Sequence, residues 1–440
     1  MAHCCRSPHP AVGNDQRVEA GPDLGVVLVF AVGLVLWGLG SARLTRWNIT
    51  APLAFVAYGL VTVRALGLVE VKAGSTAVRE IAELALALVL FSDAARVNAR
   101  SLRRDLLIPG RLLGIGLPLT IGLGVGAALV CFGHLDPWLA AVIGAALAPT
   151  DAALGAVVVE DERVPGRVRR ALNVESGLND GLATPVVTFC IVGALEATDA
   201  VVHSSLAAAL VDLGVGVLLG LAVGVVGGWL LSRERIRGWA SESFVPIAVL
   251  GLAVIAFAGA KELGVNGFVA AFVGGLAFGA VGRGLPERAA ASMQLVTLGG
   301  ELLSLVLWFL FGGFLVTVLD AAPTGVVVYA VLSLTVVRMV PVALALIGSR
   351  LHASTVAFIG WFGPRGLASI VFGLLAFDDL GRTDGAAVLG AITATVLASV
   401  VLHGITAGPL AAWYSTRVGM LDDDRPELQP APAIPTRRIG

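Results

Sequence analysis

Apolar runs of membrane-spanning length alternate with short polar segments along most of the chain. A helix that crosses a ~30 Å hydrocarbon layer needs roughly 20 apolar residues, because each residue rises ~1.5 Å. The pattern predicts an all-α polytopic membrane protein with about thirteen transmembrane helices, at Leu24–Gly40, Ile49–Val69, Glu80–Ala95, Leu106–Phe132, Pro137–Val159, Ala171–Leu195, Ser204–Leu231, Phe244–Ala260, Gly264–Gly282, Gln294–Leu319, Gly325–Ile347, Ala353–Phe377 and Ala386–Tyr414.

The two ends of the chain differ from this membrane domain, which covers residues 24–414. Residues 1–23 lack the short apolar region and small-residue cleavage site of a signal peptide, so we expect an uncleaved tail and a first helix that stays in the membrane. Residues 415–440 are charged and rich in proline, without apolar periodicity. This composition predicts a disordered tail.

Basic residues favour one set of alternate loops. Sixteen arginines lie in that set, and only Lys72, Arg79, Lys261 and Arg382 lie in the opposite one. Cytoplasmic loops of membrane proteins carry the excess of Lys and Arg. We therefore predict a multi-pass protein of the cell membrane with a cytoplasmic C-terminus and an extracellular N-terminus.

Composition agrees with a membrane location and excludes some partners. The chain has 440 residues, of which 57% are hydrophobic and 14% charged, too apolar for a soluble globule. Its formal net charge of −1 comes without a clustered basic surface, so no nucleic-acid partner is expected. Cys131 and Cys190 have no CxxC or His-rich surroundings and predict neither a disulfide nor a metal pair, and the adjacent Cys4 and Cys5 are uninformative.

Two predicted helices are interrupted in mid-membrane. The fifth contains Pro149-Thr150-Asp151, and the twelfth contains Gly363-Pro364-Arg365-Gly366. Proline removes a backbone donor, and broken helices are tolerated in a membrane only where they are buried in protein or line a cavity. The two breaks lie seven spans apart, so the second helix crosses in the opposite direction. Paired broken helices in inverted halves indicate the midplane site of a secondary transporter.

The sixth predicted helix carries a polar face of Glu175, Ser176, Asn179 and Asp180. At ~100° per residue these four side chains lie close together around the helix axis. Carboxylate, hydroxyl and carbonyl oxygens are the ligands of hard cations. An Asp180 carboxylate among apolar residues can hold either a proton or a cation, which predicts competition between the two ions.

Arg365 requires a partner at membrane depth because its guanidinium stays charged. Glu175 is the expected partner in a buried structural pair, with Glu83 or Asp93 as alternatives. Arg338, in the eleventh predicted helix, is interpreted as a snorkelling or helix-pairing residue outside the site.

Three motifs in this order resemble the NhaP-type sodium/proton exchangers of the monovalent cation/proton antiporter superfamily. They are Pro149-Thr150-Asp151, the segment from Glu175 to Gly181 that reads ESGLNDG, and the segment from Phe362 to Gly366 that reads FGPRG. The resemblance covers almost all of residues 24–414. It implies inverted repeats with two broken helices that cross at the midplane, a homodimer, and interleaved core and dimerisation subdomains. It implies no cofactor beyond the transported Na⁺ or K⁺ and H⁺.

The resemblance also implies roles for individual residues. Asp180 is the residue shared by cation and proton, and it binds the monovalent cation with Thr150 and Ser176. Asp151 helps to bind the ion or proton. Two further residues support the site: Asn179 braces the crossing, and Glu175 pairs with Arg365.

The resulting hypothesis is exchange of a monovalent cation, Na⁺ first and K⁺ as an alternative, for H⁺ by alternating access. A single carboxylate, with Asn179 preceding Asp180, resembles the electroneutral members. Two alternatives stay open. One is a transporter of a different solute, and the other is an intramembrane aspartyl hydrolase with Asp151 and Asp180 as its dyad.

Overall fold

In the computed structural model, the described residues are 24–97, 107–198, 206–281, 286–420 and 425–429, and they are helical apart from short connections. The membrane-spanning part of the fold is made of α1 (Leu24–Arg46), α2 (Ala51–Gly59), the π-helical η1 (Leu60–Ala65), α3 (Thr76–Arg96), α5 (Leu107–Arg111), the π-helical η2 (Leu112–Gly116), α6 (Leu117–Phe132), α7 (Pro137–Ala146), α8 (Ala156–Val159), α9 (Gly166–Thr198), α10 (Leu206–Ile236), α11 (Val245–Glu262), α12 (Gly267–Val281), α13 (Pro286–Asp320), α14 (Val326–Leu334), α15 (Val336–Ala345), α16 (Ala353–Trp361) and α17 (Leu367–Val418).

Several helices begin at polar residues that cap their first turn. The Thr50 hydroxyl accepts a hydrogen bond from Leu53 N–H, and the Ser75 hydroxyl accepts one from Val78 N–H. Asp136 caps α7 in the same way, directly before a proline at the first helical position. Such caps satisfy backbone donors that have no partner within the helix, so they mark where each span starts.

Helices occupy all thirteen predicted ranges within the described residues, and the fold class is confirmed. The two predicted breaks are present, between α7 and α8 and between α16 and α17. A third interruption, at Thr335 between α14 and α15, was not predicted, because no proline or glycine marks it. The last two predicted spans are joined in α17, which kinks at Gly381 with a positive φ of 79°.

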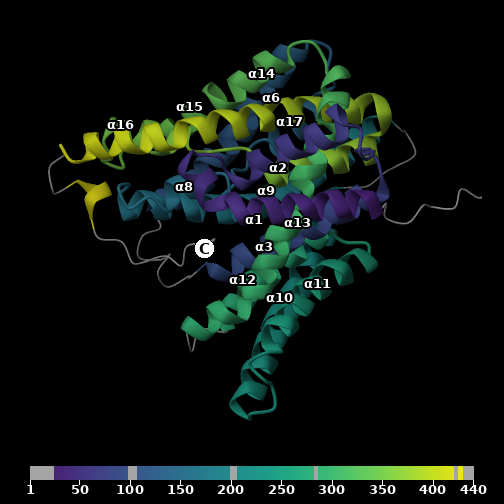
Figure 1. Ribbon diagram of the computed structural model, residues 1–440, viewed down its shortest axis with the longest axis vertical. Coiled ribbons are helices and arrows are strands. Elements are labelled where there is room, and N and C mark those ends of the chain that lie inside the picture. Colours follow the sequence, from purple (N-terminus) through teal and green to yellow (C-terminus); the bar gives the residue numbers. More distant parts are fainter. Residues whose placement is uncertain (1–23, 98–106, 199–205, 282–285, 421–424, 430–440) are drawn as a thin grey trace, which may run out of the picture.

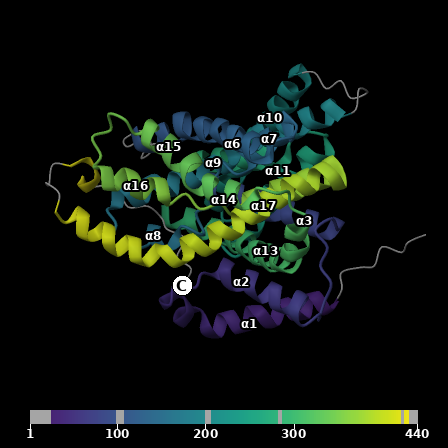
Figure 2. The same cartoon turned by 90° about the horizontal axis from the view of Figure 1, so that it is seen from above.

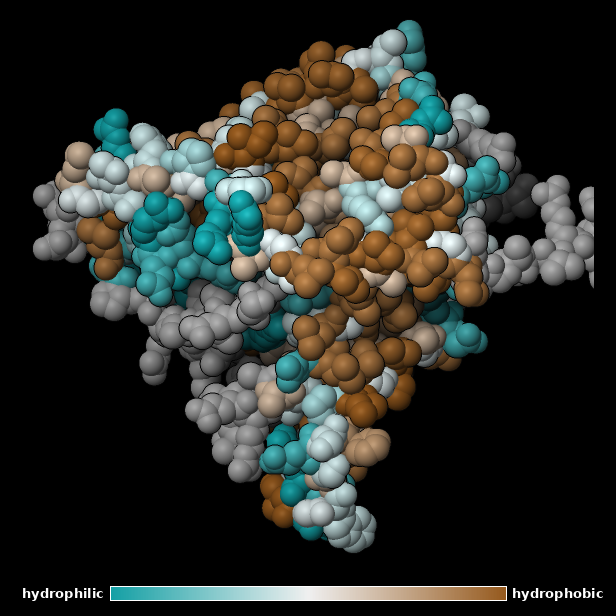
Figure 3. All heavy atoms as spheres, in the orientation of Figure 1, coloured by the Kyte–Doolittle hydropathy of each residue, from teal (hydrophilic) through white to brown (hydrophobic). Residues whose placement is uncertain are grey.

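Eight of the described helical stretches are long and apolar enough to cross a membrane, at Leu24–Arg46, Leu107–Phe132, Gly166–Ala197, Ala208–Ile236, Val245–Glu262, Ala291–Asp320, Val326–Ala345 and Thr383–Val418. The protein is therefore multi-pass, as predicted. Large apolar side chains such as Leu28 on α1, Leu218 on α10 and Val327 on α14 are exposed. Figure 3 shows apolar residues gathered over the middle of the visible face, with polar residues toward its edges. This distribution suits a surface in contact with lipid.

The helices pack into two groups (Figures 1 and 2). In the first, called the site bundle, α7 packs on α6, α9 and α17, while α14 packs on α17 and α15 packs on α16. In the second, called the scaffold bundle, α12 packs on α3, α10 and α11, and α13 packs on α2, α3 and α11. Helices α3, α12 and α13 of the scaffold bundle meet α9 and α17 of the site bundle. Both broken helices belong to the site bundle.

Glycines permit very close helix contacts inside the scaffold bundle. A Cβ atom on Gly275 of α12 would lie 2.2 Å from the carbonyl oxygen of Phe91 in α3, and one on Gly279 would lie 2.2 Å from that of Ala95. The same holds where Gly312 of α13 meets Val56 of α2. Small residues at such crossings let backbones approach, which is a main source of packing energy between helices in a membrane.

The C-terminal tail differs from the predicted disorder at two places. Helix α17 continues to Val418, and the 3₁₀-helix η3 (Pro426–Leu428) packs against the site bundle. The Glu427 carboxylate is buried there, because it accepts hydrogen bonds from His352 N–H and the Thr355 hydroxyl. Residues 1–23, 421–424 and 430–440 lie outside the described residues, so the predictions for them stay predictions.

We predict that Gly275→Ala lowers the free energy of unfolding by about 1–3 kcal/mol, because the added methyl group forces the backbones of α12 and α3 apart. Thermal melting of the purified protein in detergent measures the effect. Gly251→Ala, in α11, is the matched control, since no atom of a neighbouring element lies within 4 Å of the position that its added Cβ would take. Equal melting temperatures for the two variants would contradict the close packing.

Candidate functional site

The two broken helices cross and bond to each other at their breaks. Asp151 N–H donates to the carbonyl of Pro364 at 2.8 Å, and Leu367 N–H donates to Asp151 Oδ2 at 2.8 Å. The Ser369 hydroxyl donates to the carbonyl of Ala146 at 2.7 Å, so the start of α17 lies beside the end of α7. The crossing predicted from the paired motifs is thus present in the site bundle.

The Asp151 carboxylate bonds to the first turn of α17 and to the turn that leads into α8. Besides Leu367 N–H at the start of α17, it accepts Ala153 N–H at 2.7 Å and Leu154 N–H at 3.3 Å. The first backbone N–H groups of a helix have no intrahelical partner and carry partial positive charge, which an acidic side chain offsets. Asp151 therefore has a structural role, and its role as an ion or proton ligand stays a prediction.

Gly366 is required by the position of that carboxylate. A Cβ atom on Gly366 would lie 1.9 Å from Asp151 Oδ2, far inside van der Waals contact. The second glycine of the FGPRG motif therefore makes room for Asp151.

Arg365 is fully buried, and its side chain lies at the C-terminal end of α7. Its Nη1 donates to the carbonyls of Ala148 at 2.6 Å and Pro149 at 3.1 Å, just beyond the end of α7. Its backbone N–H donates to the Ser399 hydroxyl at 2.7 Å. A cation is stabilised by the unsatisfied carbonyls of a helix C-terminus, which carry partial negative charge. The guanidinium thus neutralises the break in α7.

The predicted Arg365–Glu175 pair is wrong, because Glu175 pairs with Arg338 of α15. Arg338 Nη1 donates to Glu175 Oε1 at 2.5 Å and Nη2 donates to Oε2 at 2.9 Å. Both side chains are at least 96% buried. A guanidinium matches the two carboxylate oxygens with two parallel bonds, which makes this geometry specific as well as strong.

Arg338 was missed as a site residue, although its position in an apolar helix gave a signal. An intramembrane arginine requires a partner, and Glu175 was already assigned to Arg365. Gly363, the first glycine of the FGPRG motif, accommodates the Arg338 side chain, since a Cβ atom there would lie 2.2 Å from Arg338 Nε. Both glycines of that motif therefore make room for charged side chains of other helices.

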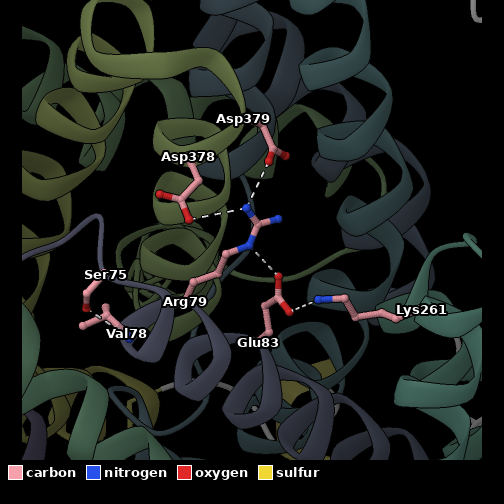
Figure 4. Close-up of polar contacts among 7 residues, drawn as sticks. All are labelled: Ser75, Val78, Arg79, Glu83, Lys261, Asp378 and Asp379. Carbon is pink, nitrogen blue, oxygen red and sulfur yellow. Dashed lines mark hydrogen bonds and ion pairs between the residues drawn. The ribbon is translucent and has the colours of Figure 1, made fainter. Parts of the chain in front are cut away.

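Glu83, an alternative partner for Arg365, lies elsewhere. Its carboxylate accepts bonds from Arg79 and Lys261, as Figure 4 shows. Asp93, the other alternative, lies in α3 beside Gly177 of α9. Because Glu175 pairs with Arg338, the Arg365 side chain bonds to main-chain carbonyls instead. Every residue has a main-chain carbonyl, so the sequence did not reveal these acceptors.

Three of the predicted site residues form a buried hydrogen-bonded group. Thr150 Oγ1 lies 2.9 Å from Ser176 Oγ, and Asn179 Nδ2 donates to Thr150 Oγ1 at 2.7 Å. These bonds join the break before α8 to the polar face of α9. Asn179 bonds to the break, its role in bracing the crossing stays a prediction, and Thr150 and Ser176 present hydroxyl oxygens to each other.

Asp180 follows Asn179 on α9 and is partly exposed. Its carbonyl accepts the Thr184 hydroxyl at 2.7 Å, which anchors the next helical turn. The following residue, Gly181, lies directly under the ring of Phe272 in α12, because a Cβ atom there would lie 2.3 Å from that ring. Asp180 thus lies where α9 of the site bundle faces the scaffold bundle.

The charges of the site leave an excess of one negative charge. In their ordinary ionised forms, the arginines 338 and 365 contribute +2 and the acids 151, 175 and 180 contribute −3, so the sum is −1. Buried charges require compensation by partners or by counter-ions. A site with this balance favours a cation over an anion.

We predict that Arg338→Met lowers the free energy of unfolding by about 3–5 kcal/mol, because it leaves the Glu175 carboxylate buried without its partner. Adding Glu175→Leu restores much of the loss. Melting temperatures of the single and double variants in detergent measure the coupling between the two residues.

Arg111→Met is the control, since Arg111 bonds only to an exposed main-chain carbonyl in the described contacts. A parallel set with Arg365→Met tests the pairing that the structure overturns. Stronger coupling of Glu175 to Arg365 than to Arg338 would count against the observed geometry.

Two known antiporters are similar to this chain in sequence. The chain is 29% identical over 320 residues to the K⁺/H⁺ antiporter NhaP2 of Shewanella sp. strain MR-4, which covers 70% of this chain and 52% of that relative. It is 24% identical over 409 residues to the Na⁺/H⁺ antiporter ApNhaP of Aphanothece halophytica, covering 90% and 75%. The chain thus spans about half the length of the NhaP2 relatives that it matches.

The fold is similar to that of the sodium proton antiporter MjNhaP1 from Methanocaldococcus jannaschii at pH 8, with a TM-score of 0.67 and 22% identity over 89% of this chain and 99% of that one. A second structure of MjNhaP1, from electron microscopy, gives a TM-score of 0.70. The model of the family described as sodium/hydrogen exchanger, transmembrane, matches residues 26–413. The chain therefore belongs to the sodium/hydrogen exchanger family of membrane transporters.

Proposed function

We propose that this protein exchanges a monovalent cation for protons across the membrane, with Na⁺ as the cation and K⁺ as the alternative. The observation that carries the proposal is the crossing of two broken helices, where Thr150 bonds to Ser176 and to Asn179, the residue that precedes Asp180 on α9. Oxygen atoms of hydroxyl and carboxylate groups suit hard monovalent cations. The relatives named as Na⁺/H⁺ and K⁺/H⁺ antiporters support the same class of cargo.

Competition between cation and proton provides the exchange. The Asp180 carboxylate binds either a proton or, with Thr150 and Ser176, a cation, and it does not bind both at once. Asp180 then changes sides only with a proton or a cation bound, because a carboxylate without a bound ion is unfavourable in apolar surroundings. This competition couples the two fluxes without any further energy source.

Arg338 and Arg365 support this assignment because their hydrogen bonds go elsewhere. Arg338 is bonded to Glu175, and Arg365 is bonded to main-chain carbonyls at the end of α7. Asp151 accepts three backbone N–H groups, an arrangement that suits a helix cap better than one carboxylate of an aspartyl hydrolase.

One-for-one exchange follows from the single exchanging carboxylate. Asn179, next to Asp180, donates to Thr150 and has no proton to exchange. The charge of Glu175 is offset by Arg338. One cation thus replaces one proton at Asp180, and the net charge of the site is the same on both crossings.

Alternating access requires one body to move against another. We assign movement to the site bundle and dimerisation to the scaffold bundle of a homodimer. The distribution of Lys and Arg supports a cytoplasmic C-terminus and an extracellular N-terminus. With that orientation, the start of α3 and the ends of α9 and α11 lie on the extracellular side.

We predict that adding Na⁺ or K⁺ to proteoliposomes with an internal pH dye and an imposed pH gradient dissipates that gradient. Asp180→Asn lowers the rate of this cation-driven proton flux at least ~100-fold. An amide neither binds a proton nor provides the charge that holds a cation. Asp161→Asn is the matched control, because Asp161 pairs with an exposed arginine in the loop before α9.

Three results separate the candidate functions. Full activity of Asp180→Asn would falsify the assignment of the exchanging residue. No cation-driven proton flux in the wild type contradicts the proposal as a whole. Comparison of the initial rates with Na⁺, K⁺ and choline identifies the cation and excludes a general leak.

We predict that the exchange rate at saturating cation is the same with the membrane potential clamped by valinomycin and K⁺ on both sides as with the potential left free. One-for-one exchange moves no net charge, so the potential does no work on the cycle. Na⁺-driven changes in the pH dye provide the measurement. A rate that depends on the imposed potential indicates an unequal number of cations and protons.

A further inference from the structure

An ion-pair network joins the two bundles on one side of the membrane. Arg79, in the first turn of α3, contacts Glu83 at 3.0 Å, Asp378 at 3.4 Å and Asp379 at 3.2 Å. The other oxygen of Glu83 pairs with Lys261 near the end of α11. Figure 4 shows the Arg79 side chain between the carboxylates of α3 and α17.

We infer that this network, called the outer network, is a latch that holds the extracellular side closed between the site bundle and the scaffold bundle. Arg79, Glu83 and Lys261 belong to the scaffold bundle, whereas Asp378 and Asp379 belong to the site bundle. The contact of Arg79 with the two aspartates therefore spans the boundary that alternating access opens and closes. This inference rests on the proposed exchange and on the proposed orientation.

Further contacts close the same side, outward of Asp180. Asn266, directly before α12, donates to the Thr188 hydroxyl of α9 at 2.9 Å. The ring of Phe272, in α12, covers Gly181. Two turns of α9 thus bear against the scaffold bundle between the predicted ion site and the outer network.

The loop before α3 meets the same region of α17. A Cβ atom on Gly74 would lie 2.9 Å from the ring of Phe377, directly before the aspartates of the network. The scaffold bundle thus contacts the end of this part of α17 with both a main-chain segment and the Arg79 side chain. The three kinds of contact, apolar, hydrogen-bonded and ionic, lie on one side of the crossing.

The outer network is connected to the crossing by one uninterrupted helical segment. Asp378 lies eleven residues after Leu367, whose N–H bonds to Asp151, and the kink in α17 comes only at Gly381. Eleven helical residues cover roughly 17 Å. Movement of the crossing therefore carries Asp378 and Asp379 with it, and their release from Arg79 frees that segment to move.

The contacts of Arg79 with Asp378 and Asp379 are partly exposed, so they are weak enough to open in each transport cycle. The side chains of Arg79, Asp378 and Asp379, whose contacts cross the boundary, are 32%, 21% and 35% exposed. Glu83, within the scaffold bundle, is buried and keeps Lys261 as a partner when Arg79 is lost. Exposed ion pairs are weak and are screened by salt. Loss of Arg79 therefore shifts the balance between closed and open states several-fold and leaves the fold intact.

Access of water-soluble reagents to the outer pathway tests the latch. The reporter is Thr184→Cys in a chain whose native cysteines are replaced, because Thr184 is buried on α9 between Gly181 and Thr188. A membrane-impermeant thiol reagent is added to intact cells, and the labelling rate is measured. We expect Arg79→Ala to raise the rate about 5-fold, and Asp378→Asn with Asp379→Asn to raise it in the same way.

Lys72→Ala is the matched control. Lys72 pairs with Glu70, and both side chains are exposed and belong to the loop before α3, so this pair does not join the bundles. We expect its labelling rate to equal that of the reporter chain alone. Unchanged labelling in both network variants, or equal acceleration by Lys72→Ala, would overturn the latch.

Proton flux measured on the same variants separates the latch from the exchange. Faster labelling of the network variants, without cation-driven flux in the wild type, supports the latch and contradicts the proposed exchange. Flux in the wild type, with labelling unchanged by the network variants, supports the exchange and contradicts the latch. Elution as a single folded species in size-exclusion chromatography excludes unfolding as the cause of faster labelling.

Discussion

The structure depends on the compensation of helix ends at the crossing of two broken helices. Each break leaves backbone donors and acceptors without partners inside the helical bundle, and each unsatisfied group costs free energy. Asp151 accepts the Leu367 N–H at the beginning of α17, and Arg365 donates to carbonyls beyond the end of α7. A negative side chain thus faces positive helix ends and a positive side chain faces negative ones. Without both, polar backbone atoms would not be stable at this depth, and Thr150 would not be held where it meets Ser176 and Asn179.

The same compensation keeps Asp180, the carboxylate proposed to exchange ions, separate from the structural charges. Glu175 and Arg338 satisfy each other in a two-bond pair, and Arg365 is bonded to main-chain atoms. The remaining acid of the polar face, Asp180, lies where α9 meets the scaffold bundle. In the proposed cycle, the structural charges keep the same partners throughout, while the charge of Asp180 is balanced alternately by a proton and by a cation. The excess of one negative charge in the site is what the transported ion offsets.

The sequence was sufficient to predict the fold class, the two breaks and the polar face, because each is written locally. Apolar runs give the spans, prolines give the breaks, and helical spacing gives the face. The pairing of charges was not local. Several arginines lie within the predicted spans, among them Arg338 and Arg365, and only their three-dimensional positions decide which one reaches Glu175. Main-chain acceptors such as the carbonyl of Ala148 carry no residue-specific signal, so the bonds of Arg365 could not be predicted. The outer network was missed for a related reason, since its members come from three helices distant in sequence.

The strengths of these interactions indicate which ones persist through a transport cycle. Breaking a buried ion pair by removal of one partner costs about 3–5 kcal/mol, whereas an exposed pair contributes about 0.2–1 kcal/mol. The Glu175–Arg338 pair and the contacts of Arg365 are buried within the site bundle, so they keep that bundle rigid. The contacts of Arg79 with α17 are partly exposed and lie between the bundles, so thermal motion separates them readily. A transporter that moves as two bodies requires this division, because strong bonds between the bundles would stop the cycle and weak bonds within the site bundle would scatter the ligands of the ion.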